Sequence, residues 1–212
     1  MHDFKYVTPN EAKTVKKDLY QILYEVQDIV REYFTFSFTP VGSSKRNMIT
    51  YDTKSNIGFD FDFNIEVNDD DEEFEPKEIR TILRNAIDRV APRYGYKYCE
   101  DSTRVLKIKK VNTFSSRINH SCDIAIVYNC KDGRQQYIHF NKRNNQYGWY
   151  YQGKGFVDLD KKIDWLKKKE LWDDLRDYYI FKKNNNDDAN KHSRSIFAEA
   201  VNEMCMKNGY RS

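Results

Sequence analysis

The sequence has few of the residues that build repetitive or cross-linked structures. Its 212 residues include eight glycines and four prolines, which excludes collagen-like and elastic repeats. The four cysteines are Cys99, Cys122, Cys130 and Cys205, and no two of them form a C-x-x-C pair. This spacing gives no support to a zinc site and predicts reduced, unpaired thiols.

Long hydrophobic runs and an excess of one charge are also missing. No window approaches the ~18 apolar residues of a membrane-spanning helix, so no membrane association is expected. The first residues lack the apolar segment of a secretory signal, which together with the unpaired cysteines predicts a cytoplasmic location. The 36 Lys and Arg residues against 33 Asp and Glu give a formal net charge of +3, which excludes a histone-like polycation.

What the sequence does contain is enough apolar material for a folded core. Aromatic residues make up 15% of the chain and hydrophobic residues 39%, against 33% charged residues. Disordered chains lack such a content of core-forming residues. At ~150 residues per domain, the length suggests one domain, or one domain with a helical annex.

The hydrophobic periodicity predicts an α+β fold, with a mixed β-sheet core, a leading helix and a C-terminal helical annex. The leading helix is expected over residues 9–34, where Thr8-Pro9-Asn10-Glu11 forms a capping box at its start. Further elements are expected as strands at 35–41, 57–67, 94–111 (two strands), 122–128 and 136–140, and as a helix from Pro76. We therefore expect a core over 1–157 and a helical region over 158–212 that packs on it.

The most informative segment is Ile57–Val67, in which apolar and polar residues alternate throughout. Asp60 and Asp62 fall on the polar face of this strand, roughly 6.5–7 Å apart along it. Two carboxylates held in this way can bind one divalent cation, or two cations ~3.5–4 Å apart. The alternative is that they belong to the solvated face of an amphipathic strand, which Asn64 and Glu66 continue.

A second feature is the turn Gly42-Ser43-Ser44, which follows the strand expected to end at Val41. A glycine-serine turn exposes backbone N–H groups and a hydroxyl, a combination that suits phosphate oxygens. Gly-Ser is also a common turn without a ligand, so both interpretations stay open at this point.

A third feature is Asp123, which enters the apolar strand expected at Cys122–Tyr128. A carboxylate in such a strand is costly to bury unless it is paired or bound to a metal. The alternative is an ordinary turn residue at the end of the strand. His120, three residues earlier, is expected to be an exposed turn residue.

Together, Val41-Gly42-Ser43, Asp60-Phe61-Asp62-Phe63 and Asp123 resemble the signature of the DNA polymerase β-like nucleotidyltransferase superfamily. That signature is hydrophobic-Gly-Ser, then Asp-hydrophobic-Asp-hydrophobic on a strand, then a third Asp on a later strand. The order of elements agrees over residues 10–207, and the chain looks closest to the branch of oligoadenylate synthases and bacterial cyclic-oligonucleotide synthases. Two departures are the long stretch between the Gly-Ser and Asp-x-Asp motifs, which implies an insertion around Met48–Asn56, and the shortness of the chain.

The resemblance implies an enzyme that uses Mg²⁺ or Mn²⁺ to transfer an NMP from an NTP to the hydroxyl of an acceptor. The acceptor is expected to be RNA, a protein or another nucleotide, and bacterial defence or toxin systems are the expected setting by analogy. By the same resemblance, Asp60, Asp62 and Asp123 would bind the metal and carry catalysis, and Gly42, Ser43 and Ser44 would bind the nucleotide.

Two other functions are compatible with the same residues. One is a small synthase of oligonucleotide second messengers, for which the short chain is less favourable than for a single transfer. The other is a catalytically silent module that keeps the fold and binds a nucleotide or RNA. No protein partner is predicted from the sequence.

Overall fold

A computed structural model describes residues 2–69, 72–152, 158–188 and 190–211. It divides into two units. The core unit contains Tyr6–Tyr51 and the described residues of Ser55–Gln152, and the helical unit contains the described residues of Met1–Lys5, Asp52–Lys54 and Gly153–Ser212. The domain boundary predicted at residue 157 lies outside the described residues.

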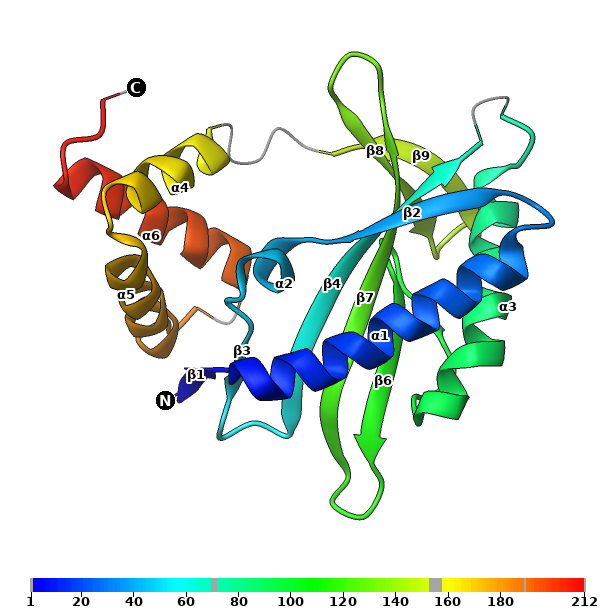
Figure 1. Cartoon of the computed structure of the whole chain (residues 1–212), viewed down its shortest axis with the longest axis horizontal. Helices are drawn as coiled ribbons and strands as arrows, with labels where there is room; N and C mark the ends of the chain where they lie inside the picture. Colours follow the sequence, from blue (N-terminus) through cyan, green and yellow to red (C-terminus); the bar gives the residue numbers. More distant parts are fainter. Residues whose placement is uncertain (1, 70–71, 153–157, 189, 212) are drawn as a thin grey trace. The chain divides into compact units, whose positions relative to one another are not determined.

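The elements confirm the predicted α+β class, with helices before, within and after a mixed sheet (Figure 1). The helices are α1 (Pro9–Val30), α2 (Gly42–Arg46), α3 (Pro76–Val90), α4 (Leu159–Lys168), α5 (Trp172–Asn184) and α6 (Ser193–Lys207), with a 3₁₀ turn η1 (Ala91–Tyr94). The strands are β1 (Phe4–Tyr6), β2 (Thr35–Pro40), β3 (Thr50–Asp52), β4 (Ile57–Asn68), β5 (Glu100–Asp101), β6 (Leu106–Asn112), β7 (Arg117–Asn129), β8 (Gln135–Asn141) and β9 (Gln146–Tyr151).

The core unit is built on a seven-stranded sheet in which β7 has three neighbours. The strand order is β2-β4-β7-β6-β5, and β8 joins β7 to β9. The pairing of β4 with β7 is parallel, and the other pairings of this sheet are antiparallel. Because β6 pairs with Arg117–Ile124 and β8 with Val127–Asn129, these two strands follow each other along one flank of β7. β1 and β3 form a separate two-stranded sheet.

The two faces of this sheet differ in polarity, as the alternation in β4 predicts. Phe61, Phe63 and Ile65 are at most 1% exposed and belong to one apolar core with buried residues of α1 and α3. Figure 1 shows α1 lying across β4, β7 and β6. The capping box at Thr8 is present at the start of α1. The opposite face of β4 carries the aspartates and is not covered by α1 or α3.

One glycine lets β4 approach β7 closely near its start. A Cβ atom on Gly58 would lie 1.8 Å from the backbone oxygen of Asn119, so a side chain there would push the two strands apart. The pairs on either side, Ile57 with Ile118 and Phe59 with His120, are in register. Gly58 therefore lets the parallel pairing begin well before the aspartates.

Three local predictions are wrong. The first helix ends at Val30 rather than near Phe34, and Gly42-Ser43-Ser44 begins a short helix rather than forming a turn. His120 is not an exposed turn residue, because β7 begins at Arg117 and continues its apolar face through this position. The His120 ring is 7% exposed, stacks on Phe59 and is hydrogen-bonded through Nε2 to the Tyr96 hydroxyl at 2.8 Å.

The first of the two strands expected within 94–111 is reduced to the two residues of β5. A buried arginine of α3 holds the turn that follows β5. Arg80 is 2% exposed, and its guanidinium pairs with Asp101 at 2.6 Å and donates to the backbone oxygens of Ser102, Val105 and Ile138.

In the helical unit, α4, α5 and α6 share a small core with fully buried Leu166, Leu175 and Val201. The Phe4 backbone N–H donates to the Asn184 side chain at 2.6 Å, and the Lys183 ammonium lies 3.8 Å from the centre of the Phe4 ring. The Thr53 hydroxyl donates to the Asp3 carboxylate. Two short segments from earlier in the chain therefore complete this unit. None of the described helices is long and apolar enough to cross a membrane.

Candidate active site

The three predicted acids lie together on the polar face of the core sheet. β4 carries Asp60 and Asp62 on this face, and the parallel register makes Asp62 the partner of Asp123 in β7. Ser121 is the partner of Asp60, is 3% exposed and donates a hydroxyl hydrogen bond to Asp60 Oδ1. Asp123 is thus in the middle of a long strand, not at the end of one as a turn residue would be.

A lysine from the neighbouring strand lies between two of these carboxylates. Lys107 of β6 is the register partner of Asp123. Its Nζ lies 3.0 Å from Asp123 Oδ1 and 3.6 Å from Asp60 Oδ1. The side chains of Lys107 and Asp123 are 25% and 27% exposed, so water screens this ion pair only in part.

The site carries more negative charge than this lysine compensates. Burial, together with the charges of Asp123 and Asp60, raises the pKa of Asp62 to about 7. Burial also raises the pKa of Asp60, although Lys107 opposes the shift. Burial alone would lower the pKa of Lys107, but the carboxylates of Asp60 and Asp123 raise it above its ordinary value. A further cation at this place would relieve the repulsion among the carboxylates.

The donor atoms fit a hard divalent cation. Magnesium takes oxygen ligands, and all three acids offer carboxylate oxygens on one face. Asp123 Oδ1 is buried and accepts no hydrogen bond from the described residues, so it is a free ligand once Lys107 moves. Among all the residues that the structure describes, no three His, Cys, Asp or Glu side chains lie close enough together to hold a metal ion as they stand. A bound metal would therefore require small movements of these side chains.

The helix α2 begins directly beside Asp62. Gly42 has φ of +58°, in the left-handed region that favours glycine. A Cβ atom at this position would lie 3.4 Å from Asp62 Oδ2, so the backbone of Gly42 borders the carboxylate. The Val41 N–H also donates to the Asp62 backbone oxygen at 3.0 Å, which fixes the end of β2 against β4.

The three residues of the predicted nucleotide-binding motif differ in their surroundings. The Ser44 hydroxyl is buried, at 2% exposure for the residue, and accepts a hydrogen bond from the Asp62 backbone N–H at 2.8 Å. Gly42 and Ser43 are partly exposed at the start of α2. The structure thus brings Gly42 and Ser44 beside Asp62, and the hydrogen bond of Ser44 positions this aspartate.

Sequence reasoning missed Lys107 and Ser121. The signal for Lys107 was the alternation Leu106-Lys107-Ile108, which places the lysine on the polar face of a strand. The signal for Ser121 was its spacing of two residues from Asp123, which puts both on one face. Neither signal identifies which carboxylate the side chain contacts, since that depends on the register of β7 with its neighbours.

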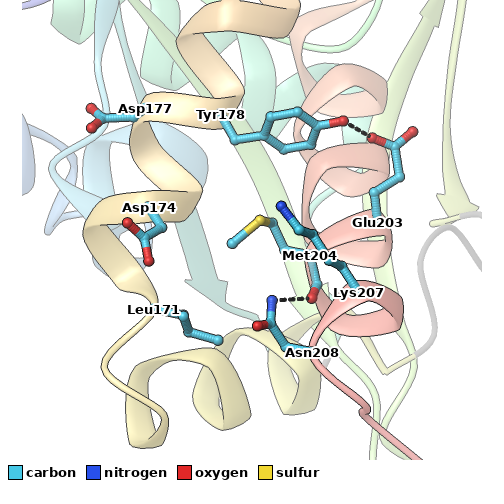
Figure 2. Close-up of a pocket in the computed structure, with 8 residues that line it drawn as sticks. All are labelled: Leu171, Asp174, Asp177, Tyr178, Glu203, Met204, Lys207 and Asn208. Atoms are coloured by element: carbon cyan, nitrogen blue, oxygen red, sulfur yellow. Dashed lines mark hydrogen bonds between the residues drawn. The ribbon is translucent and has the colours of Figure 1, made fainter.

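Two cavities are lined by residues other than these carboxylates. One of about 490 Å³ is lined by α5 and α6 in the helical unit, where the Tyr178 hydroxyl donates to Glu203 and the Asn208 side chain donates to the Met204 backbone oxygen (Figure 2). The other, of about 480 Å³, is lined by residues of β2, β4 and the end of β7. None of the predicted site residues lines either cavity.

No family model matches the chain, and no curated protein sequence matches it. Solved structures do resemble it. One is the Vibrio cholerae DncV cyclic AMP-GMP synthase in complex with the linear intermediate pppA(3′,5′)pG. It superimposes with a TM-score of 0.66 at 13% sequence identity, and the alignment covers 92% of this chain and 67% of the synthase chain. Escherichia coli DncV in its 3′-deoxy GTP bound form has a TM-score of 0.55 at 16% identity, with 93% of this chain and 53% of the DncV chain aligned. The Bradyrhizobium diazoefficiens CD-NTase CdnG in complex with GTP has a TM-score of 0.52 at 11% identity, with 83% of this chain and 43% of the CdnG chain aligned.

These similarities confirm the fold that the sequence resemblance implied. The chain has the architecture of the DncV and CdnG nucleotidyltransferases over most of its length. It spans between 43% and 67% of the length of these three chains. At these identities, the likeness establishes the architecture, and the activity has to be argued from the side chains.

Proposed function

We propose that this chain is a metal-dependent nucleotidyltransferase, which transfers an NMP from an NTP to the hydroxyl of an acceptor. The observation that carries the proposal is the register of Asp62 with Asp123, with Asp60 on the same face of the sheet. The closeness of Gly42 to the Asp62 carboxylate supports it, because the two sequence motifs meet at one place. The nucleotide complexes of DncV and CdnG support it at the level of fold.

The chemistry follows from the side chains on this face. Asp60, Asp62 and Asp123 would hold Mg²⁺ or Mn²⁺, which supplies charge neutralisation at the attacking and leaving oxygens. Asp123 would orient the acceptor hydroxyl and accept its proton. The acceptor oxygen forms a bond to the α-phosphorus, the bond from the α-phosphorus to the bridging oxygen breaks, and pyrophosphate leaves.

The motif beside Asp62 would bind the leaving part of the nucleotide. Backbone N–H groups at Gly42 and Ser43 would donate to the β- and γ-phosphates. Ser44 would act through its hydrogen bond to the backbone of Asp62, in addition to the nucleotide contact that the sequence predicts. We further propose residues 1–157 as the catalytic core and 158–212 as the helical region of the same enzyme.

The acceptor divides the proposal into three candidates: RNA, a protein hydroxyl or another nucleotide. The likeness to a cyclic AMP-GMP synthase solved with a linear dinucleotide favours the nucleotide, and thus a second-messenger synthase, as the second candidate function. A cytoplasmic role in bacterial defence is part of the proposal by analogy.

Incubation with α-labelled NTPs tests the proposal. Each of the four NTPs is supplied with Mg²⁺ or Mn²⁺, alone, with total RNA and with cell lysate. We expect label transfer and pyrophosphate release, and chromatography then separates a free oligonucleotide from labelled RNA or protein.

Variants assign the activity to the site. Asp62→Asn and Asp123→Asn should each lower the rate at least ~100-fold, because each removes a charge that the transition state requires. Glu66→Gln is the matched control, since Glu66 lies on the same face of β4, four residues beyond Asp62, and should keep the wild-type rate. Persistent activity in both Asp variants would contradict the site, and tight NTP binding without turnover would indicate a silent binding module.

A further inference from the structure

Lys107 occupies the place between two carboxylates of the site. We propose that Lys107 is a positioning residue, an internal counter-ion that holds Asp60 and Asp123 together in the metal-free chain. It leaves this place when a divalent cation binds. The second half of the proposal rests on the proposed function, because it requires a metal at these carboxylates.

The contacts of Lys107 are those of a bridging cation. Its Nζ is within ion-pair distance of Asp123 Oδ1, at 3.0 Å, and of Asp60 Oδ1, at 3.6 Å. The backbone holds the lysine there, because β6 and β7 are in register at Lys107 and Asp123. The flexible four-carbon stem lets the ammonium move while its Cα stays in place.

A divalent cation and the ammonium compete for the same oxygen atom. Asp123 Oδ1 is buried and has no hydrogen bond from the described residues, so its interaction there is the ion pair with Lys107. A cation bound to this oxygen would lie within a few ångströms of Nζ, where like charges in a half-buried site repel strongly. The ammonium must therefore swing away before, or while, the metal binds.

The same strand offers a matched comparison. Lys109 lies two residues further along β6 on the same face and is 27% exposed, close to the 25% of Lys107. Its Nζ is paired with Glu100, at 2.7 Å, rather than with an acid of the site. Substituting Lys109 removes the same charge from the same strand without breaking an ion pair to Asp60 or Asp123, although the charge of Lys109 also lowers the pKa of Asp60.

Manganese titration of the full chain tests the proposal. Free Mn²⁺ is followed by its EPR signal for wild type, Lys107→Met, Lys107→Arg and Lys109→Met, and thermal melting is recorded at pH 8 without metal. We expect Lys107→Met to bind Mn²⁺ about tenfold more tightly and to melt at a lower temperature than wild type when metal-free. Lys107→Arg should restore both properties, and Lys109→Met should stay within about twofold of wild type in affinity.

The outcomes separate this proposal from the proposed function. If wild type binds Mn²⁺ and Lys107→Met binds it equally or more weakly, the competition is disproved while the metal site stands. If neither wild type nor any variant binds Mn²⁺, the proposed function fails, and an unchanged metal-free melting temperature of Lys107→Met would disprove the counter-ion as well. Should Lys107→Met not fold, Lys107→Gln, which keeps a hydrogen-bond donor, takes its place.

Discussion

Asp62 and Asp123 are partners across the parallel pairing of β4 and β7, with both carboxylates on the same face. Neighbouring strands are ~4.8 Å apart, so this register holds two like charges close together. Burial and this repulsion raise the pKa of Asp62 to about 7, which means that ionisation costs the folded chain free energy. An arrangement of this kind favours binding of a cation over stability of the metal-free protein.

Asp62→Asn is therefore expected to stabilise the metal-free chain at pH 8. The ordinary pKa of 3.8 applies to the unfolded chain and a pKa of about 7 to the folded one, so wild type loses stability as the pH rises through this interval. The full shift corresponds to about 4 kcal/mol, and partial exposure of the side chain reduces the expected gain to about 2 kcal/mol. Urea denaturation of both proteins between pH 4 and pH 8 measures it. A gain that is the same at every pH would contradict this explanation.

Ser44→Ala is expected to destabilise the chain by about 1–3 kcal/mol, because it leaves the backbone N–H of Asp62 without its partner. Ser43→Ala is the control, since its side chain is partly exposed and its loss should cost less than about 0.5 kcal/mol. Chemical denaturation gives both values. Faster hydrogen exchange at the Asp62 amide in Ser44→Ala alone would locate the effect, and equal losses in the two variants would contradict it.

His120→Gln is expected to change the acid side of the stability profile. Burial, with the charge of Lys110, lowers the pKa of His120 to about 4, whereas the unfolded chain has the ordinary value of 6.5. The unfolded state thus takes up a proton first as the pH falls, and up to about 3 kcal/mol of stability is lost between pH 6.5 and pH 4. Gln can still bond to the Tyr96 hydroxyl but does not titrate. The difference between variant and wild type should therefore shrink as the pH falls, and a constant difference would disprove the assignment.

Arg80→Met is expected to cost about 3–5 kcal/mol, because it leaves the carboxylate of Asp101 unpaired and removes the donor to several backbone oxygens. Arg80→Lys should recover little of this loss, since one ammonium cannot replace a planar guanidinium. Arg84→Met, on an exposed position of α3 one turn later, is the control and should change stability by less than about 0.5 kcal/mol. Urea denaturation midpoints decide between these values, and similar losses at both positions would contradict the role of Arg80.

The sequence predicted the faces of β4 well because the period-two alternation from Ile57 to Val67 is a local property of the strand. The meeting of Asp62 with Asp123 was predicted only through the family resemblance. Their pairing is a tertiary contact between strands that α3 and β6 separate in the sequence, so no local pattern specifies it.

The wrong prediction for His120 and the oversight of Lys107 have the same origin. The segment from Arg117 to Ser121 is polar in sequence except for Ile118, but in the sheet it forms the start of β7, and Phe59 and Tyr96 contact the buried His120 ring. Lys107 was one of many lysines until the register of β6 placed it beside Asp123. Nucleotide binding by Gly42, Ser43 and Ser44 stays a prediction.

The chain enters the helical unit from three places, which has a consequence for how this protein can be shortened. Phe4 needs Asn184 as the acceptor for its backbone N–H, and Asp3 bonds to Thr53, which also belongs to this unit. A stop codon after Gln152 would delete Asn184 and Lys183. The Phe4 backbone N–H would then lose its acceptor, and the Phe4 ring would lose its contact with the Lys183 ammonium. Removal of the C-terminal helices by a single truncation is therefore expected to disturb the first residues of the chain as well.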